Sequence, residues 1–313
     1  NNTRRPGLKE LSRAAGLKEG GIDTEQILWV LGPRINAAGR MGGASVSYRL
    51  LTTQSPEEAR ALAEELEERN SERQKLTDAV LNKVKERIAS KAGLPLIIEG
   101  DEGYPLGVLG IAAGRLVDEF YKPAIIINLG DDLCRGSCRS IAEFNIVLAL
   151  EECRDLLVGF GGHPGAAGFT VKRQNLAQLE KKLMSRGESQ LSKLALKPEL
   201  TIDADIPLSA LDAETLPLIQ KLAPFGQGNP QPTFLSRGVE VVECRNIGGK
   251  GEYLKLKLAQ DRAVWEAVDF SRRTPAGEVP GCIDVVYRLD KSYRGGEEVL
   301  RLNLVDFVSS QAH

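Results

Sequence analysis

Apolar and polar residues follow three different patterns along the chain, and the first of them predicts one long helix. Between residues 55 and 91 there is no glycine, the only proline is Pro56, and apolar side chains recur every three or four positions. Ser55 suits the N-cap, Pro56 the first helical position, and Glu58 the partner position of a capping box. We expect a helix of about 37 residues, roughly 55 Å long, with Asn70 as the place where it could break.

The other two patterns predict an α/β domain and a β-barrel. Strand and helix periods alternate over residues 94–190, which is typical of an α/β domain. After residue 230, five short strands separated by glycine-rich turns fit a small barrel, for which the OB-fold is the natural candidate. The predicted segments are 1–54, a linking helix at 55–93, the α/β domain at 94–190, a connector at 191–230 and the barrel at 231–313.

The individual elements are expected as follows. In the α/β domain we expect strands at 94–99, 124–129, 133–140 and 169–171, and helices at 107–121, 143–157 and 175–185. In the connector we expect a strand at 200–206 and a helix at 209–222. In the barrel we expect strands at 239–244, 253–258, 263–270, 283–289 and 299–307.

Composition narrows the class of protein. The apolar fraction of 42% and charged fraction of 27% are ordinary for a globular protein, and no apolar run is long enough for a membrane span. Five cysteines without a CxxC pair and only two histidines argue against structural zinc and favour reduced thiols in a cytoplasmic protein. The net charge of −2 means that a nucleic-acid site must be a local patch. Because the chain opens on Asn1 rather than Met, we expect an excised part of a longer protein.

Residues 159–168 form a glycine-rich stretch with His163 at its centre. Five glycines leave the backbone amides open to a ligand, as around bound phosphates. A loop of this kind between a helix and a strand is a candidate active-site or binding loop. The alternative is a tight turn whose glycines serve packing.

Arg34 and Arg40 flank a second stretch of small residues that includes Asn36. Gly-Pro before it indicates a turn, and the two guanidinium groups suit a phosphate or a carboxylate. The alternative is a solvated basic turn.

Ser137 and Arg139 are two residues apart in a predicted strand. Their side chains would then point to the same face and reach one anion together. The alternative is a polar edge strand.

The barrel region offers several aromatic side chains that could stack on bases, although most aromatic residues of barrels fill cores. They are Tyr253, Trp265, Phe270, Tyr287 and Tyr293.

Four motifs give the chain a resemblance to a known family. They are Leu31-Gly-Pro-Arg-Ile-Asn-Ala-Ala-Gly-Arg40, residues 135–140, Gly161-Gly-His-Pro-Gly-Ala-Ala-Gly168 and Ala223-Pro-Phe-Gly-Gln-Gly-Asn-Pro230. With the long helix and the barrel, they make the chain resemble the RecJ family of single-strand-specific exonucleases, within the DHH phosphoesterase superfamily. The resemblance implies a DHH-associated α/β domain at 94–190, a C-terminal remnant of the DHH domain at 1–54, and an OB-fold barrel.

This resemblance also implies an activity. Members hydrolyse single-stranded DNA from the 5′ end to mononucleotides in DNA repair and recombination, using two Mn²⁺ or Mg²⁺ ions. The family's metal ligands belong to an Asp-His-His domain, and this sequence lacks that motif. We therefore expect no metal ligands in this chain, and we expect it to bind single-stranded DNA without cleaving it.

By the same resemblance, His163 is the catalytic candidate, which would hydrogen-bond the scissile phosphate. Substrate binding is expected at Arg34, Asn36, Arg40, Ser137, Arg139, Gly161 and Gly162, with Ser137 and Arg139 holding a 5′ phosphate. The implied partners are single-stranded DNA and a single-strand-binding protein or helicase, with no membrane. The alternative is a non-catalytic interaction module that recruits repair or replication proteins. A small-nucleotide phosphodiesterase is disfavoured by the trailing barrel.

Overall fold

The computed structural model describes residues 3–18, 20, 22–89, 93–249, 251, 253–270, 275–294 and 297–310, with side chains except at 292–294, 297 and 298. The chain divides into two compact units, Asn1–Pro198 and Glu199–His313. None of the helices in the described ranges combines the length and the apolar character needed to cross a membrane.

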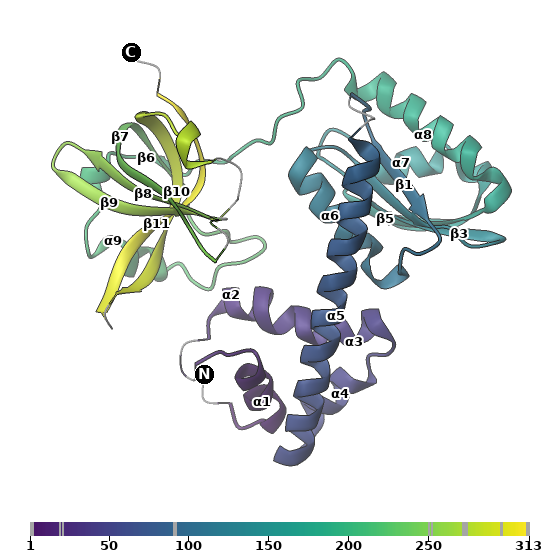
Figure 1. Ribbon diagram of the computed structural model, residues 1–313, viewed down its shortest axis with the longest axis horizontal. Helices are drawn as coiled ribbons and strands as arrows, with labels where there is room; N and C mark the ends of the chain where they lie inside the picture. The colour runs from purple at the N-terminus through teal and green to yellow at the C-terminus, as the bar shows by residue number, and fades with distance from the viewer. Residues whose placement is uncertain are drawn as a thin grey trace. The chain divides into compact units, whose positions relative to one another are not determined.

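The long helix predicted from the sequence is α5 (Pro56–Ile88), which is continuous over 33 residues, or about 50 Å (Figure 1). Its N-terminus is capped as expected, because the Ser55 hydroxyl accepts a hydrogen bond of 3.1 Å from the Glu58 amide. The reciprocal half of the predicted capping box does not form. Instead, the Glu58 carboxylate accepts hydrogen bonds from Arg49 and Thr53, which precede the helix.

The two halves of α5 serve two different cores. Leu66 packs with the helices that precede α5, whereas Val84 packs with the α/β region. The break considered near Asn70 is absent. The Asn70 side chain is 1% exposed and accepts hydrogen bonds from Arg73 one turn later, so it does not compete for the helix backbone. The predicted end near Lys91 falls outside the described residues.

In the described part of residues 3–52, four helices and a π-helix precede α5 and surround its first half (Figure 1). They are α1 (Pro6–Ala14), α2 (Thr24–Gln26), the π-helix η1 (Ile27–Leu31), α3 (Gly32–Met41) and α4 (Ser45–Thr52). The turn and loop expected at residues 32–41 are therefore wrong, since this stretch is α3. Pro33 is tolerated in its first turn, and its small residues Ala37 and Ala38 are fully buried.

The α/β region contains one mixed five-stranded sheet in the order β1-β2-β3-β5-β4, in which only β1 and β2 are parallel. The strands are β1 (Ile97–Asp101), β2 (Ala124–Asn128), β3 (Leu133–Arg139), β4 (Leu157–His163) and β5 (Ala166–Lys172). The helices are η2 (Leu106–Val108), α6 (Leu109–Phe120), α7 (Ile146–Glu151), η3 (Arg154–Leu156), η4 (Arg173–Asn175) and α8 (Leu176–Leu191).

The two faces of this sheet are covered unequally. One face packs on α7 and α8 through a core that includes Cys138 and Phe169. The other face packs on α5 and α6 through residues of β1 and β2 such as Ile126. On this second face, Gly161 and Gly168 of β4 and β5 are exposed. The sheet therefore offers an open surface next to α6.

The glycine-rich stretch is a β-hairpin rather than the predicted loop between a helix and a strand. Residues 157–163 form the edge strand β4, and the expected helix at 143–157 ends at Glu151. Glycines carry no apolar alternation, so the sequence pattern does not indicate a strand here.

The second unit is a closed barrel, as predicted. Strand β10 pairs with both β11 and β7, which closes β7–β11 on itself, and the short β6 extends the edge at β7. The elements are β6 (Ala204–Asp205), η5 (Leu208–Ala210), α9 (Thr215–Gln220), β7 (Phe234–Ile247), β8 (Tyr253–Gln260), β9 (Ala263–Asp269), η6 (Ala276–Glu278), β10 (Cys282–Arg294) and β11 (Glu297–Ser309). The barrel interior is filled by apolar side chains and by Tyr287, which is fully buried.

Candidate functional site

Strand register places four of the predicted site residues of the α/β region, Ser137, Arg139, Gly161 and His163, on one face of the sheet, whereas Gly162 stands opposite Ala167 on the other face. Ala166 of β5 stands opposite His163 on one side and Arg139 on the other. In the next row, Gly168 stands between Gly161 and Ser137. Residues opposite one another on neighbouring strands share a face, and two strand spacings amount to about 10 Å. His163 and Arg139 therefore face the same side, with only small residues between them.

Ser137 and Arg139 meet at the start of α6. A Cβ added to Gly110 would lie 3.0 Å from both the Ser137 Oγ and the Arg139 Nη2 atoms. The prediction that the two side chains share a face is confirmed. Their neighbour Cys138 points to the opposite core, where burial raises the pKa of its thiol to about 12 and keeps it unreactive.

The Arg139 guanidinium is available to an anion. Its Nη1 atom donates a hydrogen bond of 2.8 Å to the Cys138 carbonyl oxygen, and no carboxylate pairs with it among the described residues. The first turn of α6 next to it has no side-chain cap. A helix N-terminus, a hydroxyl and an unpaired guanidinium together form an anion-binding arrangement.

The sequence interpretation missed Gly110. It belongs to a pair with Gly114, one turn apart in an otherwise apolar helix, and a Cβ on Gly114 would lie 4.0 Å from the Arg139 Cγ. This spacing of glycines on one helix face was the available signal for a close approach by another element.

His163 lies at the exposed end of β4, and its imidazole has no hydrogen-bond partner among the described residues. The two glycines before it differ in what they do. Gly162 adopts φ +151°, and a Cβ there would lie 2.3 Å from the Ala166 carbonyl oxygen, so the hairpin requires glycine. Gly161 has no atom within 4 Å of an added Cβ, which leaves its surface open to a ligand.

The three predicted residues of α3 are placed differently from one another. Arg34 forms a two-point ion pair with Glu67 of α5 and also donates to the Val30 carbonyl oxygen, so its charge is already balanced. Asn36 is exposed. Arg40 reaches the segment before α6, where its Nη1 donates a hydrogen bond of 3.3 Å to the Gly107 carbonyl oxygen. The structure thus brings Arg40, and not Arg34, next to the start of α6.

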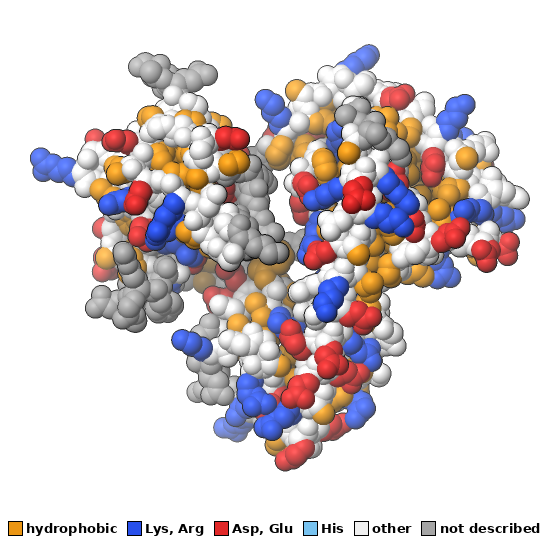
Figure 2. Space-filling view, viewed as in Figure 1, with side chains coloured by type: hydrophobic (Ala, Val, Ile, Leu, Met, Phe, Trp, Pro, Cys, Tyr) orange, Lys and Arg blue, Asp and Glu red, His pale blue; other side chains and the backbone are white. Residues whose placement is uncertain are grey.

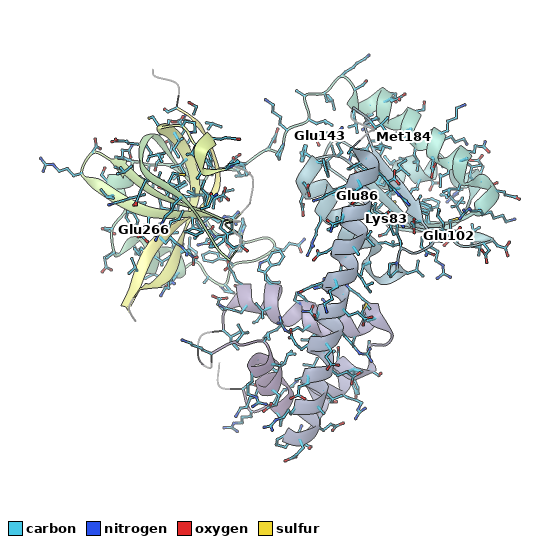
Figure 3. The ribbon with its side chains drawn as sticks, in the orientation of Figure 1. Lys83, Glu86, Glu102, Glu143, Met184 and Glu266 are labelled. Atoms are coloured by element: carbon cyan, nitrogen blue, oxygen red, sulfur yellow. The ribbon has the colours of Figure 1, made fainter. Side chains whose placement is uncertain are left out.

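The barrel has a groove of about 640 Å³ across β7, β8, β9 and β11. Charges of both signs line it, and Lys255 pairs at 2.9 Å with Glu266, which is labelled in Figure 3. Trp265 lines the groove and Phe270 is 44% exposed, so both stay candidates for base stacking. Tyr287 is not one, because it is fully buried and its hydroxyl hydrogen-bonds Ser236.

A metal centre is not formed by the described part of the chain. No three His, Cys, Asp or Glu side chains gather there in a way that could hold a metal ion.

Comparison with known proteins agrees with this architecture. The DHHA1 domain family matches residues 74–186, and the RecJ OB domain family matches residues 202–306. The single-stranded-DNA-specific exonuclease RecJ of Bacillus subtilis is 34% identical over 284 residues, which are 89% of this chain and 36% of that protein. Crystal structures of RecJ from Thermus thermophilus with Mn²⁺ and with Mg²⁺ superpose with TM-scores of 0.85 and 0.84 at 27% identity. Each match covers 99% of this chain. The matched regions are 45% of the Mn²⁺-bound chain and 47% of the Mg²⁺-bound chain.

The fold is thus a DHHA1 domain joined to an OB domain, with the long helix α5 leading into the former. The chain belongs to the RecJ family. It spans about a third to a half of the length of the relatives it matches.

Proposed function

We propose that this chain is the substrate-binding part of a 5′→3′ exonuclease that degrades single-stranded DNA to mononucleotides in DNA repair and recombination. Family membership supports the class of enzyme and of substrate. The observation that carries the proposal is the unpaired Arg139 guanidinium, which meets the Ser137 hydroxyl at the uncapped start of α6.

In this proposal the site holds the terminal 5′ phosphate of the strand. A terminal phosphate carries close to two negative charges and three acceptor oxygens. Arg139 would bind two of these oxygens in a planar pair of hydrogen bonds, Ser137 would donate a third, and the helix N-terminus favours the charge. An internal phosphodiester has less charge and fewer free oxygens, so the site would select strand ends.

On the same face, His163 would donate a hydrogen bond to an oxygen of the scissile phosphate and stabilise the charge that develops there. Gly161 would let the strand approach the backbone because nothing else occupies that side. Asn36 and Arg40 would contact the strand where it enters. Arg34 would act there only after exchanging its contact with Glu67 for a phosphate.

We propose that the whole enzyme uses Mn²⁺ or Mg²⁺, the ions present in the crystallised relatives, with ligands outside this chain. This chain alone would then bind DNA without hydrolysing it. A cytoplasmic location and contacts with a single-strand-binding protein or helicase belong to the same proposal.

Binding measurements test the phosphate site. Fluorescence anisotropy would compare one oligonucleotide with a 5′ phosphate and with a 5′ hydroxyl. We expect wild type to prefer the phosphorylated strand by about tenfold or more, since hydrogen bonds to charged groups contribute about 1.5–3 kcal/mol. Arg139→Ala should remove this preference.

Arg135→Ala is the matched control. Arg135 is exposed on the same strand, stands opposite Thr170, and also carries one positive charge. It should keep the preference for phosphorylated ends. Equal affinity of wild type for phosphorylated and hydroxyl-terminated strands would contradict the assignment of the phosphate site. Release of mononucleotides by this chain with Mn²⁺ would contradict the proposal that the chain alone does not hydrolyse DNA.

A further inference from the structure

Arg73 lies in the middle of α5, is 8% exposed, and has no carboxylate partner among the described residues. Its Nε and Nη2 atoms donate hydrogen bonds of 3.3 and 2.9 Å to the Asn70 side-chain oxygen, which is neutral. A buried charge without a counter-charge is unfavourable. The fold therefore keeps a guanidinium in a place where stability alone does not favour it.

The neighbouring arginines show that a neutral amide is an unusual partner for an arginine on this helix. Acidic and basic side chains alternate along the exposed side of α5 (Figure 2), and most arginines on or against this helix have a carboxylate. Arg34 pairs with Glu67, Arg69 with Glu65 and Arg115 with Asp78. Arg73 and Arg40 are left without an acidic partner among the described residues.

Arg73 and Arg40 belong to one cluster at the junction of α3, α5 and the start of α6. Burial lowers the pKa of the Arg73 guanidinium, the positive charges of Arg115, Arg40 and Arg34 lower it further, and the negative charge of Asp78, which pairs with Arg115, opposes this only in part. Arg40 in turn packs on the segment before α6, since a Cβ on Gly107 would lie 2.1 Å from its carbonyl oxygen. That segment is three residues from Gly110, where Ser137 and Arg139 meet.

We infer that Arg73, oriented by Asn70, and Arg40 form a second anion site, which binds an internal phosphodiester of the single strand. This inference rests on the proposed function and extends it from the 5′ terminus to the following part of the strand. The bound diester supplies the direct acidic contact that Arg73 lacks among the described residues. Asn70 positions the guanidinium and leaves Nη1 free of protein hydrogen bonds among the described residues.

The salt dependence of binding separates this site from the terminal one. For single strands, each neutralised phosphate contributes about 0.7 to the slope of log K against log salt concentration. Arg73→Gln should weaken binding of phosphorylated and hydroxyl-terminated strands by the same factor, about tenfold, and reduce the slope by about 0.7. The preference for a 5′ phosphate should not change. Arg69→Gln, which removes a charge that Glu65 already balances one turn earlier, should leave the slope as in wild type.

Asn70→Asp gives a second test that does not depend on losing the arginine. The new carboxylate would pair with Arg73 inside the protein, so the melting temperature should rise while affinity for both strands falls about tenfold. If Asn70 and Arg73 had a purely structural role, a substitution that raises the melting temperature would not also lower the affinity for DNA.

The outcomes are distinguishable. If wild type binds no single-stranded DNA, both this inference and the proposed function fail. If wild type binds with salt dependence, but Arg73→Gln behaves as Arg69→Gln does and Asn70→Asp binds as wild type, only the second site is refuted.

Discussion

Asp101, at the end of β1, joins the sheet to α5 and should make the first unit sensitive to acid. Its carboxylate accepts contacts of 2.7 Å from both Lys83 and Arg87, which are one turn apart on α5, and of 2.9 Å from the Gly103 amide. Figure 3 shows Lys83 on that helix. These contacts, led by Lys83, lower the pKa of Asp101 from 3.8 to about 2.

The magnitude follows from the pKa difference between the folded and unfolded chains. The shift from 3.8 to about 2 is slightly under two units, and at about 1.36 kcal/mol for each unit it contributes about 2 to 2.5 kcal/mol to the free energy of unfolding. Because the pKa is lower in the folded state, the contribution is complete above the unfolded pKa. It is lost as the pH falls from about 4 through about 2. We expect about 1 kcal/mol to remain at pH 3.

Asp101→Asn keeps the shape of the side chain and removes its charge. Urea unfolding, followed by circular dichroism at pH 6, 4, 3 and 2.5, would compare the variant with wild type. The difference in unfolding free energy should be about 2 kcal/mol at pH 6 and shrink steadily toward pH 2. Asp78→Asn is the control, because its pair with Arg115 is largely exposed and should contribute about 1 kcal/mol or less.

A difference between Asp101→Asn and wild type that stays constant from pH 6 to pH 2.5 would refute the reasoning. It would mean that the charge of Asp101 does not contribute and that the variant acts only through altered packing.

Three glycine substitutions test the candidate site. Gly162→Ala should lower the melting temperature, since its Cβ would strike the Ala166 carbonyl oxygen at a φ of +151°, whereas Gly161→Ala should melt as wild type does and weaken only DNA binding. An equal loss of stability in both variants would contradict this assignment. Gly110→Ala should keep the fold, because its Cβ would meet only the side-chain ends of Ser137 and Arg139, and should reduce the preference for a 5′ phosphate about tenfold. An unchanged preference, measured by anisotropy, would show that the phosphate binds elsewhere.

The sequence was sufficient to predict the helices and strands whose apolar residues recur with a regular period. A stretch without glycine defined α5, and alternating strands defined both the α/β region and the barrel. It failed where turn residues occur inside regular structure. Pro33 indicated a turn but lies in the first turn of α3, and the glycines of residues 159–162 hid the strand β4.

The candidate site was predicted as far as it depends on local spacing. Ser137 and Arg139 share a face because strand side chains alternate. Contacts between distant residues could not be assigned from the sequence, although the glycine pair Gly110 and Gly114 signalled that some element approaches α6 closely. The pairing of Arg34 with Glu67 joins positions 33 residues apart, and the approach of Arg139 to Gly110 depends on how α6 packs on the sheet.

The exposed face of β4 and β5 also limits what the surface can recognise. Gly159, Gly161 and Gly168 place bare backbone there, so that along these two strands His163 and Thr170 are the side chains of this face that could contact a base. Contacts to sugar and phosphate position a strand but carry no information about its bases. If a strand is held on this face as proposed, through its sugars and phosphates, its affinity should depend little on the base sequence.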